Sequence, residues 1–178
     1  QNFTRFGSIT PFLQIGGDAS AKEGWRIAVS MIYGYTKNQE KAWEIIEKLG
    51  LCSEQECKVQ FTMADRKINA VMSTSAGRLF DAVSAILGIR RQSSFEGEAS
   101  TALQFAAEEF EQKGKLNGNE IWDNVQPVIL GLEGRCILNT EALVKQIVEA
   151  KLQGTDSGEL AYLFHQTLAE QVVAACIE

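Results

Sequence analysis

Apolar residues recur at helical spacing along most of this chain, and the clearest stretch covers residues 76–88. Its apolar positions fall at i, i+1, i+4, i+7 and i+8, the pattern of an amphipathic helix; they are Leu79, Phe80, Val83, Ile86 and Leu87. Residues 73–75 (Ser-Thr-Ser) can each cap a helix, and Gly88 follows as glycine follows a helix end. We therefore predict a helix whose opposite, polar face carries Arg78 and Asp81 at the surface.

The same spacing predicts six further helices. They begin at a capping box of Ser20 and Glu23, at Asn38, at a capping box of Ser53 and Glu56, at Ala99, at Thr140, and at Asp156 with Glu159. Gly50 and Gly154 end the second helix and the one that starts at Thr140. The last helix should bury a stripe that includes Leu160, Phe164 and Val172.

Strand signals are fewer. Alternating apolar residues between Gln126 and Asn139, interrupted by Glu133-Gly134, predict one β-hairpin with a two-residue turn. Residues 3–15 indicate a short strand and an extended arm, and Lys67–Met72 is expected to be a connector. The predicted fold is a single domain over residues 1–178, mainly α (α+β), with about seven helices, one hairpin and one or two more short strands.

Composition narrows the possible functions. The chain of 178 residues carries a net charge of −6, which argues against a nucleic-acid binder because such proteins need a basic face. No apolar run reaches the roughly 20 residues of a membrane span, and no signal-peptide pattern opens the chain. We therefore expect a cytoplasmic protein with no nucleic-acid and no membrane partner. The first residue is not Met and the last residues stop within a predicted helix, so we expect a piece of a longer chain.

The four cysteines are scattered at positions 52, 57, 136 and 176, and His165 is the only histidine. This set lacks the two close pairs of a zinc site, so we expect free thiols and no metal site. His165 lies off the apolar stripe of the last helix, which is typical of a half-exposed histidine bonded to a neighbour. Asp18 follows Gly16-Gly17, where a carboxylate is usually a turn or cap residue.

Two interpretations of the stretch around Gly77 remain open from the residues alone. Gly77 has no Cβ, so a ligand can approach the first turn of the helix, whose unpaired N–H groups attract an anion. Asp81, one turn further on, could accept hydrogen bonds from ligand hydroxyl groups. Alternatively, the stretch is a capped helix with a surface Arg–Asp pair and a glycine for close packing.

Three segments of the sequence resemble segments of one protein family. STSAGRLFDAVSAILGI followed by FEGEA, RFGSITPFLQIGGDASAKEGWRIA, and YLFHQTLAEQVV are similar to segments of the C-terminal region of the HypF carbamoyltransferases of NiFe-hydrogenase maturation. A G-x-x-F-D helix followed by an aromatic-x-G turn also marks the related tRNA threonylcarbamoyltransferases. One departure is Ile15, where the HypF pattern usually has proline.

The resemblance implies a helix-rich fragment of a domain from the actin-like ATPase superfamily. It implies a carbamoyltransferase that uses carbamoyl phosphate and ATP, through carbamoyl-adenylate, to carbamoylate a cysteine of a partner hydrogenase-maturation protein. Nucleotide or carbamoyl-adenylate contacts would come from Gly77, Asp81, Gly97 and Glu98. The family's metal-binding histidines and Gly-rich phosphate loop would lie outside this chain, in the rest of the full-length protein. No catalytic residue is assigned, and the fragment alone is expected to be inactive; the alternative function is a non-catalytic helical interaction module.

Overall fold

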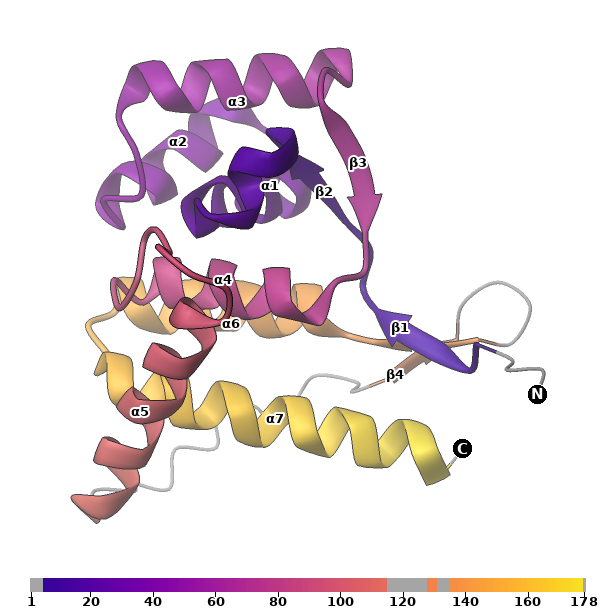
Figure 1. Ribbon diagram of the computed structural model, residues 1–178, viewed down its shortest axis with the longest axis vertical. Coiled ribbons are helices and arrows are strands. Elements are labelled where there is room, and N and C mark those ends of the chain that lie inside the picture. Colours follow the sequence, from indigo (N-terminus) through magenta and orange to yellow (C-terminus); the bar gives the residue numbers. More distant parts are fainter. Residues whose placement is uncertain (1–4, 115–127, 131–134, 178) are drawn as a thin grey trace.

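The computed structural model describes residues 5–114, 128–130 and 135–177 and is mainly helical (Figure 1). Its helices are α1 (Gly24–Thr36), α2 (Gln39–Lys48), α3 (Glu54–Arg66), α4 (Ala76–Ile86), α5 (Glu98–Gln112), α6 (Thr140–Leu152) and α7 (Ser157–Ile177). A short 3₁₀ helix, η1 (Gly17–Ala21), precedes α1. The predicted fold class, with seven α-helices among the described residues, is confirmed.

Among the described residues, five short strands form two small sheets. They are β1 (Gly7–Ile9), β2 (Phe12–Ile15), β3 (Ala70–Ser73), β4 (Val128–Leu130) and β5 (Cys136–Leu138). One sheet has the order β1-β5-β4, with β1 parallel and β4 antiparallel to β5; in the other, β2 pairs antiparallel with β3. The predicted pairing of residues 128–130 with 136–138 is confirmed, whereas its turn at 133–134 lies outside the described residues.

The prediction of a connector over Lys67–Met72 was wrong, because residues 70–73 form β3. A strand with one buried face alternates apolar and polar residues, and that alternation is the usual sequence signal. Val71 and Met72 are neighbours and both exposed, so β3 carries no such alternation. Its partner β2 supplies the buried side chains Phe12 and Ile15.

Helix α4 lies at the centre of the core. Every residue from Leu79 to Leu87 is buried except Phe80, which is half-buried. The predicted one-sided stripe was therefore wrong, since helices pack around α4 on more than one side. Helix α1 packs along it most extensively, and α5, which also packs on α7, covers another side.

Several predicted helix starts are confirmed. The Asn38 side chain accepts from the Lys41 N–H, and the Ser75 side chain accepts from the N–H three residues on. Ser53 and Glu56 form the predicted capping box, in which each side chain bonds the other residue's backbone N–H. These local signals are reliable because they depend on only four consecutive residues.

The capping box predicted for Ser20 and Glu23 was wrong. Ser20 is buried in η1, where its hydroxyl donates to the Gly17 carbonyl and accepts from the Gln14 side chain. Helix α1 starts later, at Gly24, with no side-chain cap from Glu23. The Gly16-Gly17 turn, with positive φ at both residues, leads into a 3₁₀ turn that shifts the helix start.

Two further local predictions needed correction. The cap of α6 is Asn139, whose side chain accepts from the Ala142 N–H; Thr140 is the first helical residue. In α7 the predicted stripe is interrupted at Val172, which is 46% exposed, while Gln171 and Ala175 are buried.

Candidate functional site

The two segments singled out in the sequence meet at one cleft of about 520 Å³. The start of α4 contributes Ser75 and Arg78, and the loop before α5 contributes residues 94–96. The other lining residues are Gln14, Ala21 and Lys22, from β2 and from η1 with its C-cap. Segments nearly twenty residues apart in sequence are thus brought to one place by the packing of α1 and α5 on α4.

The loop between α4 and α5 is tied to the start of α1. The Ser93 N–H donates to the Lys22 carbonyl at 2.7 Å, and the Trp25 N–H donates to the Arg91 carbonyl at 3.4 Å. The Arg91 guanidinium also lies over the Trp25 ring, 5.0 Å from its centroid, and donates from Nε to the Leu51 carbonyl at 2.6 Å. These contacts hold one wall of the cleft in place.

Gly77 leaves the first turn of α4 open. A Cβ added there would meet nothing closer than Ser75 Oγ, at 3.8 Å, and the residue is exposed. The N–H groups of a first helical turn have no partner within the helix. Access of a ligand to the backbone at Gly77, as expected from the sequence, is therefore compatible with the geometry.

Asp81 does not lie at the surface, so this part of the prediction was wrong. Its residue exposure is 6%, and a Cβ on Gly24 of α1 would approach the Asp81 carbonyl oxygen to 2.6 Å. Helices α1 and α4 thus pack in close contact at this pair. Burial raises the pKa of the Asp81 carboxyl, and the neighbouring Arg78 only partly opposes that rise.

Arg78 is one of two cationic side chains that line the cleft, with Lys22. One of its guanidinium nitrogens lies 3.1 Å from Asp81 Oδ2, and another donates to the Ala21 carbonyl at 2.6 Å. Asp81 Oδ2 nevertheless receives no well-aligned hydrogen bond within the described part of the chain. Sequence spacing predicted the pair of Arg78 and Asp81. It did not predict that, of these two side chains, only Arg78 would line the cleft.

Gly97 and Glu98 shape the loop rather than line the cleft. Gly97 caps α5 with φ of 83°, in the left-handed region that favours glycine. Glu98 Oε2 accepts from the Ser94 N–H at 2.5 Å and from the Ser94 hydroxyl at 2.9 Å. These bonds to Ser94, with a smaller contribution from Arg90, lower the pKa of the Glu98 carboxyl.

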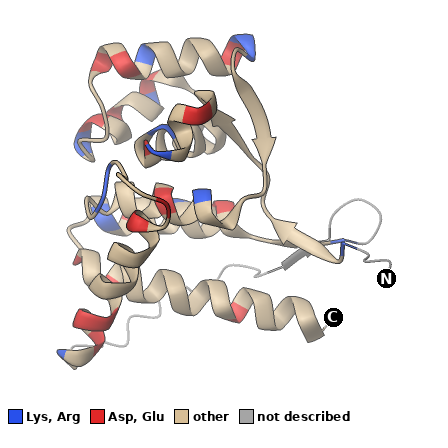
Figure 2. Cartoon of the chain, in the orientation of Figure 1, with Lys and Arg blue, Asp and Glu red and all other residues tan. Residues whose placement is uncertain are grey.

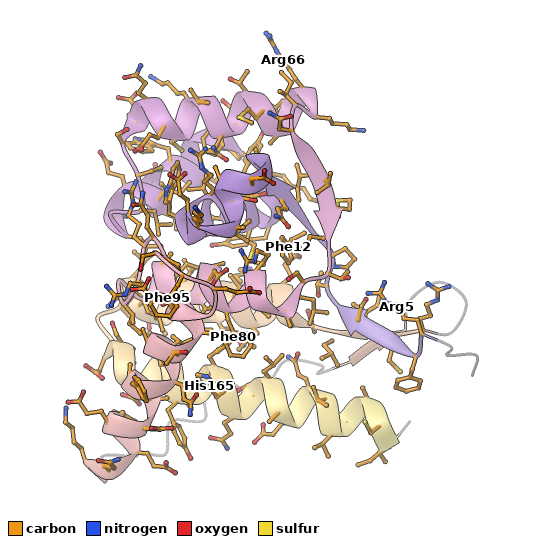
Figure 3. All side chains as sticks on the ribbon, viewed as in Figure 1. Arg5, Phe12, Arg66, Phe80, Phe95 and His165 are labelled. Atoms are coloured by element: carbon orange, nitrogen blue, oxygen red, sulfur yellow. The ribbon has the colours of Figure 1, made fainter. Side chains whose placement is uncertain are left out.

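Lys22, which sequence reasoning missed, joins Arg78 and Phe95 in giving the cleft its chemistry. Lys22 and Arg78 supply positive charge beside the N-terminal turn of α4, and Glu96 adds one carboxylate to the lining. The two cations and the helix start together favour a phosphate or another anion. Phe95, labelled in Figure 3, lines the cleft and is 64% exposed, so it offers an aromatic face for stacking. Nothing in the sequence around Lys22 marks it as a cleft residue. A ligand with a phosphate and a planar ring fits this combination.

His165 and Asp18 lie outside the cleft lining. His165 Nδ1 is 2.7 Å from the Ala161 carbonyl, and its ring packs edge-on at 5.5 Å from Phe80 and Phe164 (Figure 3). The predicted half-exposed histidine bonded to a helical neighbour is confirmed. Asp18 is exposed in the first turn of η1, as a turn carboxylate would be.

The four cysteines are free thiols. A hydrogen bond between Cys52 and Cys57 lowers the pKa of the first thiol and raises that of the second. Within the described residues, no group of three or more His, Cys, Asp and Glu side chains could hold a metal ion. No helix in that part of the chain is both long and apolar enough to cross a membrane.

Comparisons with known proteins give the family. The profile described as carbamoyltransferase, Kae1-like domain, second subdomain, matches residues 1–178. A probable carbamoyltransferase HypF of Methanocaldococcus jannaschii is 31% identical over 166 residues, which cover 93% of this chain and 20% of that protein. A carbamoyltransferase HypF homolog of Cupriavidus necator is 28% identical over 172 residues, covering 95% of this chain and 41% of that protein. The chain thus spans between one fifth and two fifths of these relatives.

Solved structures agree on the fold. A crystal structure of full-length HypF in the phosphate- and nucleotide-bound form has a TM-score of 0.76 at 23% identity, covering 99% of this chain and 21% of that one. The crystal structure of T. kodakarensis HypF has a TM-score of 0.72 at 22% identity, covering 97% and 22%. The profile match over the whole chain, together with these relatives, shows that this chain belongs to the HypF carbamoyltransferase family and corresponds to the second subdomain of its Kae1-like domain.

Proposed function

We propose that this chain forms one wall of the nucleotide site of a larger carbamoyltransferase. That enzyme would use ATP and carbamoyl phosphate to make carbamoyl-adenylate and pass the carbamoyl group to a cysteine of a partner protein in NiFe-hydrogenase maturation, in the cytoplasm. Metal ligands would come from the rest of the full-length protein. Within this chain, the cleft residues bind and orient the nucleotide rather than react with it.

The observation that carries the proposal is the cleft where the start of α4 meets residues 94–96. Arg78 and Lys22 would attract phosphate oxygens, and the open backbone at Gly77 would allow close approach to the first turn of α4. Phe95 would stack on the base. A relative with the same fold has been crystallised with phosphate and nucleotide bound, which supports a nucleotide in this family.

Asp81, Gly97 and Glu98 support the cleft from behind in this proposal. Asp81 holds the Arg78 guanidinium, and Glu98 closes the loop that carries Phe95. A direct contact from Asp81 to a nucleotide hydroxyl would require the carboxylate, now nearly inaccessible, to become exposed. Burial raises the pKa of its carboxyl, and perturbed pKa values of this kind are common at functional sites.

The test is a calorimetric titration of the full-length protein with ATP and with a non-hydrolysable adenylate. Lys22 is exposed, so Lys22→Met should keep the fold while weakening ATP binding by about tenfold, the worth of one contact to a charged group. The matched control is Lys58→Met, on the exposed side of α3 and away from the cleft.

Three outcomes are informative. Weaker binding in the Lys22 variant alone supports the cleft as the nucleotide wall. Equal loss in both variants would show a general charge effect and would overturn the assignment. Failure of the full-length protein to bind either nucleotide would favour the helical interaction module instead.

A further inference from the structure

Strand β3 has one backbone edge that no other described strand covers. It pairs only with β2 among the described strands, and Figure 1 shows it along the outer side of the molecule. The Gly16 N–H donates to the Asn69 carbonyl at 3.0 Å, which fixes the phase of the antiparallel ladder. Residue 71 then bonds to β2, while the N–H and C=O groups of Ala70 and Met72 point away from it. Within the described part of the chain, two residues of β3 therefore offer unpaired backbone groups to another strand.

The side chains of β3 lack the usual protection of an edge. Val71 is 62% exposed and Met72 is 65% exposed. Edge strands of monomeric proteins usually carry a charge, a proline or a bulge that prevents pairing with another chain. Residues 70–73 read Ala-Val-Met-Ser and contain no charge and no proline. An exposed apolar edge of this kind indicates a surface that another strand covers.

Each face of the β2–β3 ribbon borders a cavity: one face borders the cleft described above, and the other borders a second cavity. Gln14 pairs with Val71, so both lie on the face that borders the nucleotide cleft. Leu13 pairs with Met72 on the opposite face, where both line a second cavity of about 450 Å³ beside α1. A strand added along β3 would present alternate side chains to these two cavities. Met31 of α1 also lines the second cavity, which suits an apolar side chain.

Positive charge flanks the free edge at both ends. Arg66 and Lys67 precede β3, and neither forms an ion pair with another described residue; Arg66 points away from the molecule in Figure 3. Arg5 lies at the other end, where it donates to Thr74 Oγ1 at 2.7 Å. The nearby Asp65 already accepts hydrogen bonds from other side chains. The chain as a whole carries a net charge of −6, so cations gathered at the two ends of one strand (Lys and Arg are blue in Figure 2) favour binding of an acidic partner there.

We propose that the free edge of β3 is a docking site for an extended segment of a partner protein. The segment would have alternating apolar side chains and acidic residues at both ends. Its backbone would pair with Ala70 and Met72, one apolar side chain would enter the cavity beside Met31, and its acidic ends would meet Arg66 and Arg5. Backbone pairing supplies affinity in this mode of recognition, and the cavities that receive side chains supply specificity. The proposal does not depend on the nucleotide site.

The test uses the full-length protein and a fluorescein-labelled peptide, Asp-Asp-Val-Thr-Phe-Thr-Val-Glu, followed by fluorescence anisotropy. The wild type should bind this peptide, and a peptide with lysines in place of the acidic residues should bind at least about tenfold more weakly. Hydrogen exchange with single-residue resolution provides the second readout. Peptide binding should slow exchange at the Ala70 and Met72 amides and leave the already bonded Val71 amide unchanged.

Met72→Pro removes one outward N–H, and proline is tolerated on an edge strand where its N–H would face solvent. We expect this variant to lose at least about tenfold in peptide affinity, while Met72→Leu, which keeps both the N–H and the apolar side chain, stays within about twofold. Exchange at the Val71 amide checks that β2 and β3 remain paired in each variant.

Unchanged affinity in Met72→Pro would overturn the proposal, because backbone pairing would then play no part. Slow exchange at Ala70 and Met72 before any peptide is added would also overturn it, since the rest of the full-length chain would then cover the edge. No binding of the acidic peptide, with both amides exchanging rapidly, would show that the edge is free but does not recognise this class of segment.

Discussion

The two walls of the cleft differ in how they are held. Residues 75–81 belong to a helix whose later residues are buried in the core, with Asp81 only 6% exposed against Gly24. Residues 94–98 belong to a loop fixed mainly by polar bonds, such as those from Ser94 to Glu98. Both walls carry a carboxylate that the sequence marks for ligand contact. In each case the carboxylate supports the wall, and other side chains face the cleft.

The two carboxylates also respond to their surroundings in opposite directions. Burial raises the pKa of Asp81, whereas the bonds from Ser94 lower the pKa of Glu98. A charge kept in a desolvated position weakens the fold unless its partner compensates. A charge that accepts backbone and hydroxyl hydrogen bonds stabilises the loop around it. The α4 wall is therefore rigid and bears an electrostatic cost, while the loop wall depends on hydrogen bonds that water can replace.

The largest expected difference between the walls lies in apolar truncation. Leu79→Ala empties core volume at a side chain that is 0% exposed and should lower the free energy of unfolding by about 2–5 kcal/mol. Phe95→Ala, at 64% exposure, should change it by less than about 0.5 kcal/mol. Urea unfolding of the 178-residue chain measures both. Similar losses in the two variants would mean that the loop wall is packed as tightly as α4.

A smaller effect is expected from a single added methyl group. Gly24→Ala places a Cβ 2.6 Å from the Asp81 carbonyl oxygen, so α1 and α4 must move apart, at about 1–3 kcal/mol. Gly77→Ala meets open space within the same wall and should be neutral or stabilising by up to about 1 kcal/mol. Thermal unfolding of the two alanine variants gives the comparison. A stable Gly24 variant would contradict close helix packing at Asp81.

The smallest effect is a difference in pH dependence. The pKa of Asp81 is raised from 3.8, so the folded state takes up this proton more readily than the unfolded chain. Its destabilising contribution at neutral pH should fade as the pH drops through the raised value towards 3.8. The pKa of Glu98 is lowered from 4.5, so its stabilising contribution is complete above 4.5 and is lost as the pH falls through the lowered value.

Two isosteric variants measure these contributions. The stability of the wild type relative to Asp81→Asn should rise on acidification, and its stability relative to Glu98→Gln should fall. Urea midpoints at several values between about pH 6 and pH 3 give both curves. If both relative stabilities changed in the same direction on acidification, the two carboxylates would have similar surroundings and the contrast between the walls would disappear.

Local signals in the sequence predicted much of this fold. The caps at Asn38 and Ser53 were predicted correctly, and Ser75 is one of the three caps that the sequence offered for α4, because a cap depends on a few neighbouring residues. The burial of Asp81 was not predicted, because it depends on Gly24, which lies far away in sequence and allows α1 to approach α4. Strand β3 was missed because its exposed side chains do not alternate.

The site was predicted only in outline. The family resemblance placed attention on Gly77 and on the FEGEA turn, and the structure brings both segments to one cleft. Lys22 lies at the same cleft because it follows η1. The position of η1 depends on the Gly16-Gly17 turn before it and on the hydrogen bond from the Ser93 N–H to the Lys22 carbonyl after it. Such long-range placement leaves no periodic or motif signal in the residues themselves.

The most direct test of the cleft is a hydrogen-exchange footprint of the full-length protein with and without a non-hydrolysable ATP analogue. We predict slower exchange at the amides of residues 76–78 and 94–97 on binding, with no change at residues 33–37 beside the second cavity. The same footprint in Gly77→Ala should be weaker at equal ligand concentration. Protection confined to residues 33–37, or protection at 76–78 that the Gly77 substitution leaves intact, would contradict the assignment of the nucleotide wall.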